Sequence, residues 1–289
     1  MFHAGPAKQM HWLDIDSQTV TPSLLRGTDP DAMTGCPVMY DIGKIATFGG
    51  APDYDLAWAT THTHVIDING AEAVVTRADD MGFRRAMHNV VVLPDGDIIV
   101  AGGVEYAETF SDGFSVLTAE LFHPPTLSFT RIPVDMRVPR NYHSSALLLK
   151  DGRVLVGGGG VCGRCAANHP DVEILTPPYL FEADGITLRS RPMVQSISDD
   201  TIVAGGSISV TMGTADAGHT FSLVRFGAVT HGINLDQRRV PLSVASQIGS
   251  VFTLSLPTNP HVLLPGYYFL FAMNAAGTPS VAETVFRPV

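Results

Sequence analysis

Short apolar runs separated by turn residues make up most of the chain. The clearest example is residues 88–103, where an apolar run, the dipeptide Asp95-Gly96, a second apolar run and the pair Gly102-Gly103 follow one another. Asp-Gly between two apolar runs predicts a tight β-hairpin, because the favoured two-residue turn needs backbone angles with positive φ. No long stretch keeps the 3.6-residue period of an amphipathic helix, so the pattern favours β-strands throughout.

The same order of features recurs along the chain. Residues 143–158 form a second copy, with its turn at Asp151-Gly152, and residues 38–50 form a degenerate copy. The glycine pairs begin at residues 49, 102 and 157, which gives spacings of 53 and 55 residues. Further strands are predicted over residues 64–68, 119–122, 129–132 and 172–175. Four strands in about 50 residues, with a glycine pair after the second, are typical of a kelch-type β-propeller blade.

The number of predicted blades is too small for a closed ring. Three copies are expected at roughly residues 30–80, 81–135 and 136–185, and Phe2–Asp16 resembles the end of an earlier blade. Three and a half blades leave open sheet edges, which propellers avoid by closing the ring. We therefore expect an N-terminal half or a second chain to complete the ring. A homodimer of two half-rings is a further geometric option.

The pattern changes after Pro192. Short alternating strands are predicted over residues 202–210, 221–225, 252–256, 266–273 and 281–286. This spacing is typical of an immunoglobulin-like β-sandwich. The expected fold is therefore all-β, with a partial kelch-type propeller of a seven-bladed ring over residues 1–188 and a β-sandwich over residues 189–289.

Composition excludes several classes of protein. Hydrophobic residues make up 45% of the chain and charged residues 16%, as in a globular protein. The formal charge of −10 argues against nucleic acid as a partner, because phosphate binding needs a basic surface. No apolar run reaches the roughly 18 residues of a membrane span. Residues 1–6 lack the basic start and the apolar stretch of a signal peptide.

Cysteine usage is sparse, with one C-x-x-C pair and one single cysteine. Cys162 and Cys165 form the pair, which is compatible with redox chemistry, metal binding or a small disulfide loop. One pair cannot complete a four-ligand zinc site, and this one follows a glycine-rich strand instead of opening a helix. We expect a local disulfide and with it an oxidising compartment. Cys36 is expected to be a small buried residue.

Two stretches carry side chains suited to metal or proton chemistry. Tyr142 and His143 lie side by side at the start of an apolar strand, where the alternation of the pleat is not yet set and both side chains can reach one site. A polar pair that caps the strand is the alternative. His231 lies on a loop next to Gly232; binding groups are frequent on such loops, although loop histidines also occur without function.

With these residues identified, the chain resembles the copper-radical oxidases, the family of galactose oxidase and glyoxal oxidase. The resemblance covers nearly the whole chain. Its landmarks are residues 30–33, 40–41, 48–50, 52–54, 91–96, 142–144, 157–160, 168–169, 236–239 and 264–267. The Tyr-His-Ser stretch and the Thr-His loop that ends in Asp-Gln-Arg-Arg are specific to this family.

The resemblance implies a seven-bladed propeller with one copper ion on its axis and a sandwich that sends a loop into the ring. His143 and His231 resemble the two imidazole ligands, and Tyr142 resembles the axial tyrosine that also acts as general base. Imidazole suits Cu(II), and a metal-bound phenol can take the proton of a substrate hydroxyl. Cys162 and Cys165 match the short disulfide loop of the family.

The resemblance also bears on the substrate and the second cofactor. Tyr54 and Phe110 resemble aromatic residues of the substrate pocket, with packing at the blade edge as the alternative. The family uses a tyrosine cross-linked to a cysteine, and both residues lie in blades that precede Phe2. The Tyr-Cys radical cofactor is therefore not expected to be encoded in this chain. Asp55 stands where the family has an amide, which argues against galactose as the substrate.

Two functions follow from these observations. In the first, the chain is the C-terminal portion of an extracellular copper-radical oxidase that needs an N-terminal half. It would oxidise a primary alcohol, an aldehyde or a carbohydrate with O₂ and release H₂O₂. In the second, the chain is a non-catalytic kelch and sandwich protein that binds a partner or a glycan. Neither function involves nucleic acid or a membrane.

Overall fold

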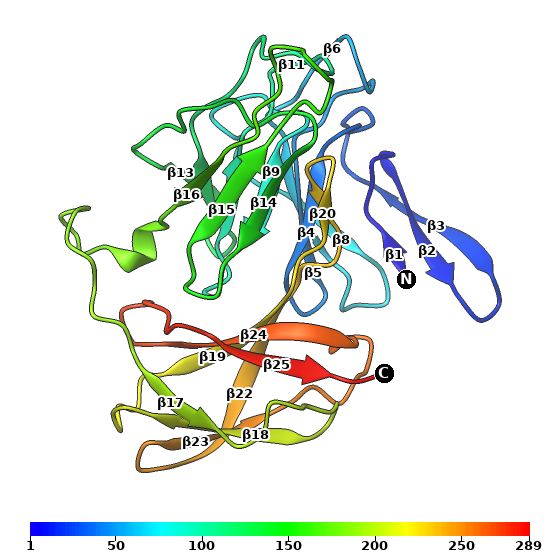
Figure 1. Ribbon diagram of the computed structural model, residues 1–289. Coiled ribbons are helices and arrows are strands. Elements are labelled where there is room, and N and C mark those ends of the chain that lie inside the picture. The colour runs from blue at the N-terminus through cyan, green and yellow to red at the C-terminus, as the bar shows by residue number, and fades with distance from the viewer.

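The computed structural model describes all residues, Met1–Val289, and confirms the all-β prediction. The only helical element is the 3-10 helix η1 (Pro178–Leu180). Several small sheets form the upper part of the molecule in Figure 1, and one larger folded sheet forms the lower part. None of the helical structure is long and apolar enough to cross a membrane.

Four antiparallel sheets form the propeller part. Their strands, in the spatial order of each sheet, are β1 (Phe2–His3), β2 (Gln9–Asp14) and β3 (Thr19–Leu25); β4 (Cys36–Asp41), β5 (Lys44–Phe48), β7 (Thr63–Asp67) and β8 (Val74–Arg77); β13 (Ser128–Arg131), β12 (Glu120–His123), β10 (Ile98–Ala101) and β9 (Asn89–Val92); and β14 (Ser144–Leu148), β15 (Val154–Gly158) and β16 (Val172–Leu175). A two-stranded ribbon of β6 (Ala57–Trp58) and β11 (Tyr106–Ala107) joins segments of two blades, at the end of the blades away from the sandwich in Figure 1.

Two of the three predicted copies are four-stranded blades, whereas the third has three strands. The expectation of three full copies is therefore corrected. The residues after β16 include Pro177 and Pro178, which lack the backbone N–H that a fourth strand would need. The N-terminal segment also differs from the expectation, because it forms a three-stranded sheet that continues past Asp16 to Leu25.

A buried arginine ties the strands together in each of two neighbouring blades. Arg85 is fully buried and donates to the carbonyl of Gly102 at 2.7 Å and to the Glu120 carboxylate at 2.8 Å. Arg140 is also fully buried and donates to Asp171 at 2.6 Å. No role was predicted for these arginines from the sequence. Each precedes a histidine by three residues in the repeat, and this shared spacing is the signal that could have found them.

The C-terminal residues form one seven-stranded antiparallel sheet that folds into two layers. Its strands in spatial order are β17 (Val194–Ile197), β18 (Ser207–Met212), β23 (Val251–Ser255), β22 (Arg239–Ile248), β19 (Thr220–Arg225), β24 (Gly266–Met273) and β25 (Glu283–Arg287). The first half of β22 pairs with β19 and the second half with β23, so this strand belongs to both layers. Between the layers lies a core that includes Phe221, Leu223, Phe252, Leu254, Tyr268 and Leu270.

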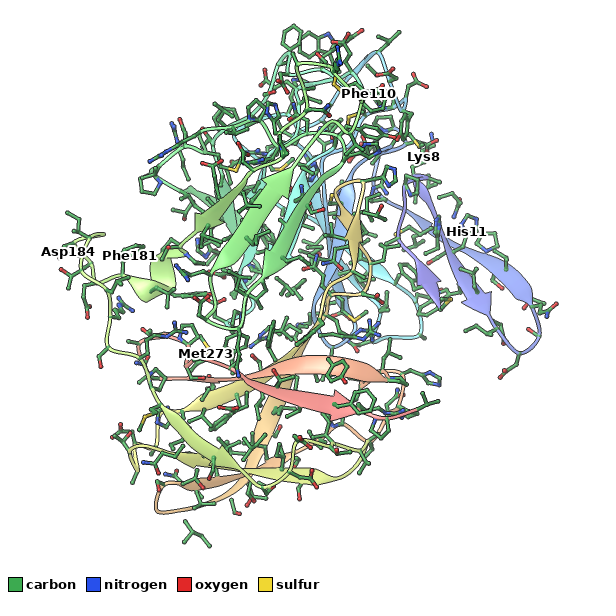
Figure 2. The ribbon with its side chains drawn as sticks, viewed as in Figure 1. Lys8, His11, Phe110, Phe181, Asp184 and Met273 are labelled. Carbon is green, nitrogen blue, oxygen red and sulfur yellow. A yellow bond between two sulfur atoms is a disulfide. The ribbon has the colours of Figure 1, made fainter.

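The sandwich packs directly against the blades. One apolar cluster contains Phe48 and Val92 of the blades together with Phe271 and Met273 of the sandwich. Figure 2 labels Met273 at this junction. Because the core is shared, the two parts stabilise each other. The predicted division at residue 188 falls in the connection between η1 and β17 and stays a prediction.

A hairpin from the sandwich reaches up between the blades. Strands β20 (Val229–Thr230) and β21 (Ile233–Asn234) form a two-stranded ribbon just before β22. In Figure 1 this hairpin rises beside β4 and β14, and it also contacts β9. Three different blades therefore meet around one segment of the sandwich. We call the place where β4, β9 and β14 surround the hairpin the hub.

Candidate metal centre

Three side chains that are far apart in the sequence lie together at the hub. The ring centroids of Tyr142 and His143 are 4.0 Å apart, with the rings stacked. The ring of His231 lies 4.6 Å from that of His143 and 5.5 Å from that of Tyr142. Tyr142 and His143 are half-buried, and His231 is exposed. The structure thus brings together the residues that the sequence predicted as metal ligands.

A β-turn explains how two adjacent residues reach the same site. Tyr142 and His143 lie before β14, not within it, and the Ser144 N–H donates to the carbonyl of Asn141 at 2.9 Å. His143 has a φ of 65°, in the left-handed region that a β-branched residue would avoid. This corner replaces the strand alternation that would place the two side chains on opposite faces.

A second tight turn presents His231. Because Val229 pairs with Asn234 and Thr230 with Ile233, the loop consists of His231 and Gly232 alone. Their φ angles of 56° and 78° are both positive, as a type I′ hairpin turn requires. His231 was predicted to lie on a loop, and it lies at the tip of the hairpin inside the hub.

Hydrogen bonds set the orientation of both imidazoles. His143 Nδ1 lies 2.6 Å from the carbonyl oxygen of Gly160, which only accepts, so Nδ1 carries the proton and Nε2 carries the lone pair. His231 Nδ1 lies 2.7 Å from the Thr230 hydroxyl. A threonine hydroxyl can accept as well as donate, so this contact is compatible with a proton on Nδ1 and a lone pair on Nε2 of His231. Partners of this kind fix metal-binding histidines in other proteins.

Gly160 holds the Tyr142–His143 turn through both of its backbone groups. Its N–H donates to the carbonyl of Tyr142 at 2.8 Å, while its own carbonyl accepts from His143. Gly160 has a φ of 76°, and a Cβ atom there would collide with the carbonyl oxygen of Ala167. The glycine run was noted in the sequence, but the contact of Gly160 with His143 was not foreseen.

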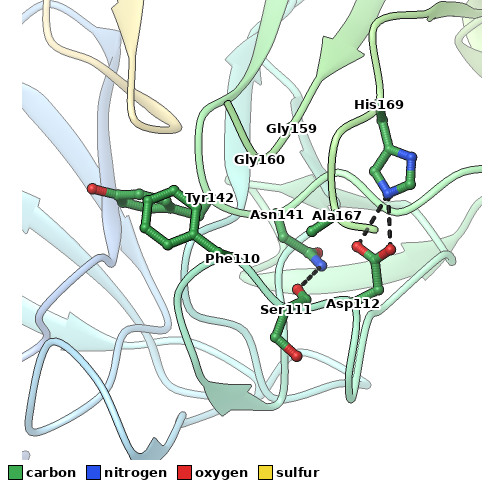
Figure 3. Close-up of a pocket in the computed structure, with 9 residues that line it drawn as sticks. All are labelled: Phe110, Ser111, Asp112, Asn141, Tyr142, Gly159, Gly160, Ala167 and His169. Atoms are coloured by element: carbon green, nitrogen blue, oxygen red, sulfur yellow. Dashed lines mark hydrogen bonds and ion pairs between the residues drawn. The ribbon is translucent and has the colours of Figure 1, made fainter. Parts of the chain in front are cut away.

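Aromatic rings flank Tyr142. The rings of Phe110 and Tyr54 meet it edge-on, at centroid distances of 5.1 Å and 6.1 Å. Phe110 is 44% exposed and Tyr54 42% exposed, so both keep a face open to an incoming molecule. Partial burial, together with the neighbouring Tyr142, raises the pKa of Tyr54 to about 12, so Tyr54 stays a neutral phenol. Figure 3 shows the Phe110 and Tyr142 rings side by side.

The loop that carries the cysteines closes the other side of the site. Cys162 and Cys165 form a disulfide, and Cys36 is buried and unpaired. His169 Nε2 lies 3.0 Å from the Asp112 carboxylate, which joins this loop to the loop of Phe110 (Figure 3). The segment that supports Gly160 is therefore tied to the neighbouring blade.

A cavity of about 220 Å³ opens beside His231 and Tyr54. Asp29 lies in its wall, with His62 Nδ1 at 2.7 Å and His64 Nε2 at 3.5 Å from its carboxylate oxygens. Burial lowers the pKa of His64 to about 4, so this imidazole is neutral near pH 7. Nowhere in the chain do three or more His, Cys, Asp or Glu side chains form a metal-binding group.

The donor set at the hub fits copper. Two imidazole nitrogens and one phenol oxygen match the N and O ligands that Cu(II) prefers. Only two of these three donors, the histidines, belong to the His, Cys, Asp and Glu side chains that hold most metal ions in proteins. The remaining coordination positions would be available to water or substrate.

Comparisons with known proteins agree with this geometry. A family model described as "Galactose oxidase-like, Early set domain" matches residues 191–286, and one described as "Glyoxal oxidase N-terminus" matches residues 51–167. Galactose oxidase of Gibberella zeae is 41% identical over 296 residues, which cover 99% of this chain and 43% of the relative. The chain belongs to the galactose oxidase and glyoxal oxidase family.

Other members of the galactose oxidase family are also similar. An aldehyde oxidase of Vitis pseudoreticulata, GLOX, is 32% identical over 234 residues, which cover 73% of this chain and 43% of the relative. The solved structure of a fungal alcohol oxidase of the AA5 family, in complex with copper, superposes with a TM-score of 0.96 at 45% identity. The match covers 100% of this chain and 61% of the alcohol oxidase chain. The chain thus spans about half the length of the curated relatives it matches.

Proposed function

We propose that Tyr142, His143 and His231 bind one copper ion, and that this site belongs to an oxidase of primary alcohols or aldehydes. The observation that carries the proposal is the convergence of one phenol and two imidazoles from two different β units. Nδ1 of each imidazole has a hydrogen-bond partner, which leaves Nε2 of each ring to bind the ion. Membership of the galactose oxidase family supports the choice of copper.

In this proposal each residue of the site has a distinct task. A bound cupric ion supplies Lewis acidity and one-electron redox chemistry. Tyr142 accepts the hydroxyl proton of the substrate, as a general base within reach of the ion. Phe110 and Tyr54 present exposed rings beside Tyr142 and orient the carbon chain of the substrate. Over one turnover the alcohol loses two electrons and two protons, and O₂ gains them as H₂O₂.

The hydrogen atom on the substrate carbon needs a second acceptor. We infer that the Tyr-Cys radical cofactor of the family takes this role and is supplied by an N-terminal half. Cys162 and Cys165 are engaged in the disulfide, and the Cys36 thiol donates to the carbonyl of His88 at 3.0 Å. This use of all three cysteines supports a source outside these 289 residues.

We place the protein in an oxidising, extracellular compartment. The support is the disulfide, because disulfides of this kind persist where thiols are not kept reduced. The substrate class is a small primary alcohol, aldehyde or carbohydrate; the support is the pair of exposed aromatic rings, Tyr54 and Phe110, beside Tyr142.

Peroxide formation tests the proposed function. The 289-residue chain is loaded with Cu(II), mixed with the N-terminal half of a family member, and given a primary alcohol and O₂. H₂O₂ is then measured with a peroxidase-coupled dye. We expect peroxide only when both halves and copper are present. If the complemented protein binds copper but forms no peroxide from any primary alcohol or aldehyde, the oxidase proposal is wrong, and the non-catalytic alternative takes its place.

A further inference from the structure

The innermost strand of the third sheet has a free edge at the hub. β9 ends the sheet order β13-β12-β10-β9, so the N–H and C=O groups on its far side have no strand partner. Unpaired backbone groups at a buried edge are costly, because the desolvated groups lose their hydrogen bonds to water. Something other than a strand must therefore pair with β9.

Gln237 supplies that pairing through its side chain. Its Nε2 donates to the carbonyl of Val90 at 2.7 Å, and its Oε1 accepts from the N–H of Val92 at 3.1 Å. A residue in a parallel neighbouring strand bonds in the same way to two residues on either side of its partner. The primary amide of Gln237, which is only 5% exposed, thus takes the place of a peptide group opposite Val91.

The hairpin that carries His231 is anchored to the same strand at a second point. The backbone of Gly232 packs on His88, which directly precedes β9, and a Cβ atom on Gly232 would lie 2.7 Å from the His88 carbonyl oxygen. The Cys36 thiol lies 3.0 Å from that oxygen and 3.4 Å from the carbonyl oxygen of Gly232. The hairpin therefore touches β9 near its tip and at its base.

Two hydrogen bonds to the Asn234 side chain hold the base of the hairpin together. The Asn234 side-chain oxygen accepts from the N–H of Ala228 at 3.1 Å and from the N–H of Gln237 at 3.2 Å. These two bonds close the hairpin across its open end. With the base closed and Gln237 paired to β9, the position of His231 along β9 is fixed.

We propose that Gln237 is a positioning residue for His231. Its amide sets the register of the hairpin against β9 and so holds the His231 imidazole opposite Tyr142 and His143. This inference rests on the proposed copper site. The feature that singles out Gln237 is that its amide is the only side-chain group hydrogen-bonded to the backbone of both Val90 and Val92.

Two substitutions and one control test the inference in the full chain. Gln237→Leu removes both hydrogen bonds, and Gln237→Glu keeps an acceptor for Val92 but loses the donor to Val90. Gln247→Glu makes the same chemical change on the exposed half of β22. Amide hydrogen exchange at Val92 reports the pairing without any metal. Titration with Cu(II), followed by the copper EPR spectrum, reports the position of His231.

We expect Gln237→Leu to speed exchange at Val92 and to weaken Cu(II) binding about tenfold, the size seen when an outer-shell partner of a metal ligand is removed. Gln237→Glu buries a carboxylate oxygen against the Val90 carbonyl, so it should weaken Cu(II) binding at least as much and alter the EPR spectrum, and Gln247→Glu should have no effect. If exchange at the Val92 amide is unchanged in Gln237→Leu, the pairing of Gln237 with β9 is wrong. Faster exchange with unchanged copper affinity and EPR spectrum would overturn the positioning role.

Failure of the proposed copper site would give a different result from failure of the positioning role. If the wild-type chain binds no Cu(II), the copper site is wrong and the positioning role falls with it, although exchange at Val92 still decides whether Gln237 pairs with β9. If Gln237→Leu does not fold, Gln237→Glu carries the test with the same two measurements.

Discussion

At the residue scale, the site depends on two residues with positive φ. His143 and His231 both adopt left-handed backbone angles, which let the chain turn sharply and point an imidazole inward. The sequence identified both histidines, because their chemistry and local context are unusual. It did not predict the turns, since histidine is not among the residues that mark such turns most strongly. The contacts of Gly160 and Thr230 with these histidines were missed, because a backbone carbonyl and a common hydroxyl leave no distinctive pattern.

Replacing Gly160 by alanine should weaken copper binding. The new methyl group collides with Ala167, so the Gly160 carbonyl must move away from His143 Nδ1. We expect the dissociation constant for Cu(II) to rise about tenfold, as for loss of other outer-shell partners. Isothermal titration with Cu(II) measures this change.

Gly163→Ala is the matched control for that variant. Gly163 has a φ of 71°, close to the 76° of Gly160, but a Cβ atom there meets nothing within 4 Å. Both variants therefore carry the same backbone strain of about 1 kcal/mol. Equal copper affinities of the two variants would show that the contact between Gly160 and His143 does not orient the ligand.

At the scale of elements, the hairpin turns were the most predictable feature. The turns at Asp95-Gly96 and Asp151-Gly152 lie between the predicted strands, β9–β10 and β14–β15. The strands β17 and β22 were missed. The second half of β22 is exposed, and its apolar residues Val244, Ala245 and Ile248 do not occupy every second position, so it lacks the alternation that marks a half-buried strand. Its place is set by pairing with β23, a contact between residues that the local pattern does not report.

The buried arginines should matter more for stability than any surface ion pair. Arg85→Met keeps most of the volume but leaves the Glu120 carboxylate buried without its partner. We expect a loss of about 3 kcal/mol in the free energy of unfolding, as is typical when one member of a buried pair is removed. Urea unfolding followed by circular dichroism measures the change.

Arg131→Met is the control on the same sheet. Arg131 pairs with Asp135, but its side chain is 60% exposed, so its removal should cost less than about 0.5 kcal/mol. A loss for Arg85→Met no larger than that for Arg131→Met would contradict the structural role given to the buried arginine.

At the scale of the whole molecule, the sandwich and the blades meet around the β9–β10 turn. Arg239 and Ser222 of the sandwich both donate to the carbonyl of Pro94, at 2.7 Å and 2.8 Å. The sequence predicted the two kinds of β structure and their order along the chain. It did not predict that they share a core, because that depends on which faces of distant strands meet.

This junction should make stability depend on pH. Burial, with a further contribution from the nearby Asp97 charge, raises the pKa of Asp95 to about 7 from an ordinary value of 3.8. Between these two values the folded protein binds a proton that the unfolded chain does not. The stabilisation of the folded state by the proton on Asp95 is therefore complete below pH 3.8 and is lost as the pH rises through about 7.

Asp95→Asn tests this dependence. The amide oxygen can still accept from the Asp97 N–H, as the carboxylate does at 3.1 Å, but the site no longer titrates. From pH 5 to pH 8 we expect the variant to gain about 1–2 kcal/mol in unfolding free energy relative to the wild type, an estimate that allows for solvent screening. A constant difference between the two proteins across this range would contradict the raised pKa.

The EPR spectrum of the copper-loaded chain tests whether Tyr142, His143 and His231 bind one copper ion. One equivalent of Cu(II) should give a single species whose superhyperfine pattern reports two imidazole nitrogens. His231→Ala should leave the circular dichroism unchanged, reduce the pattern to one nitrogen and weaken binding. A wild-type spectrum without two coupled nitrogens, or an unchanged spectrum for His231→Ala, would show that these residues do not form the copper site.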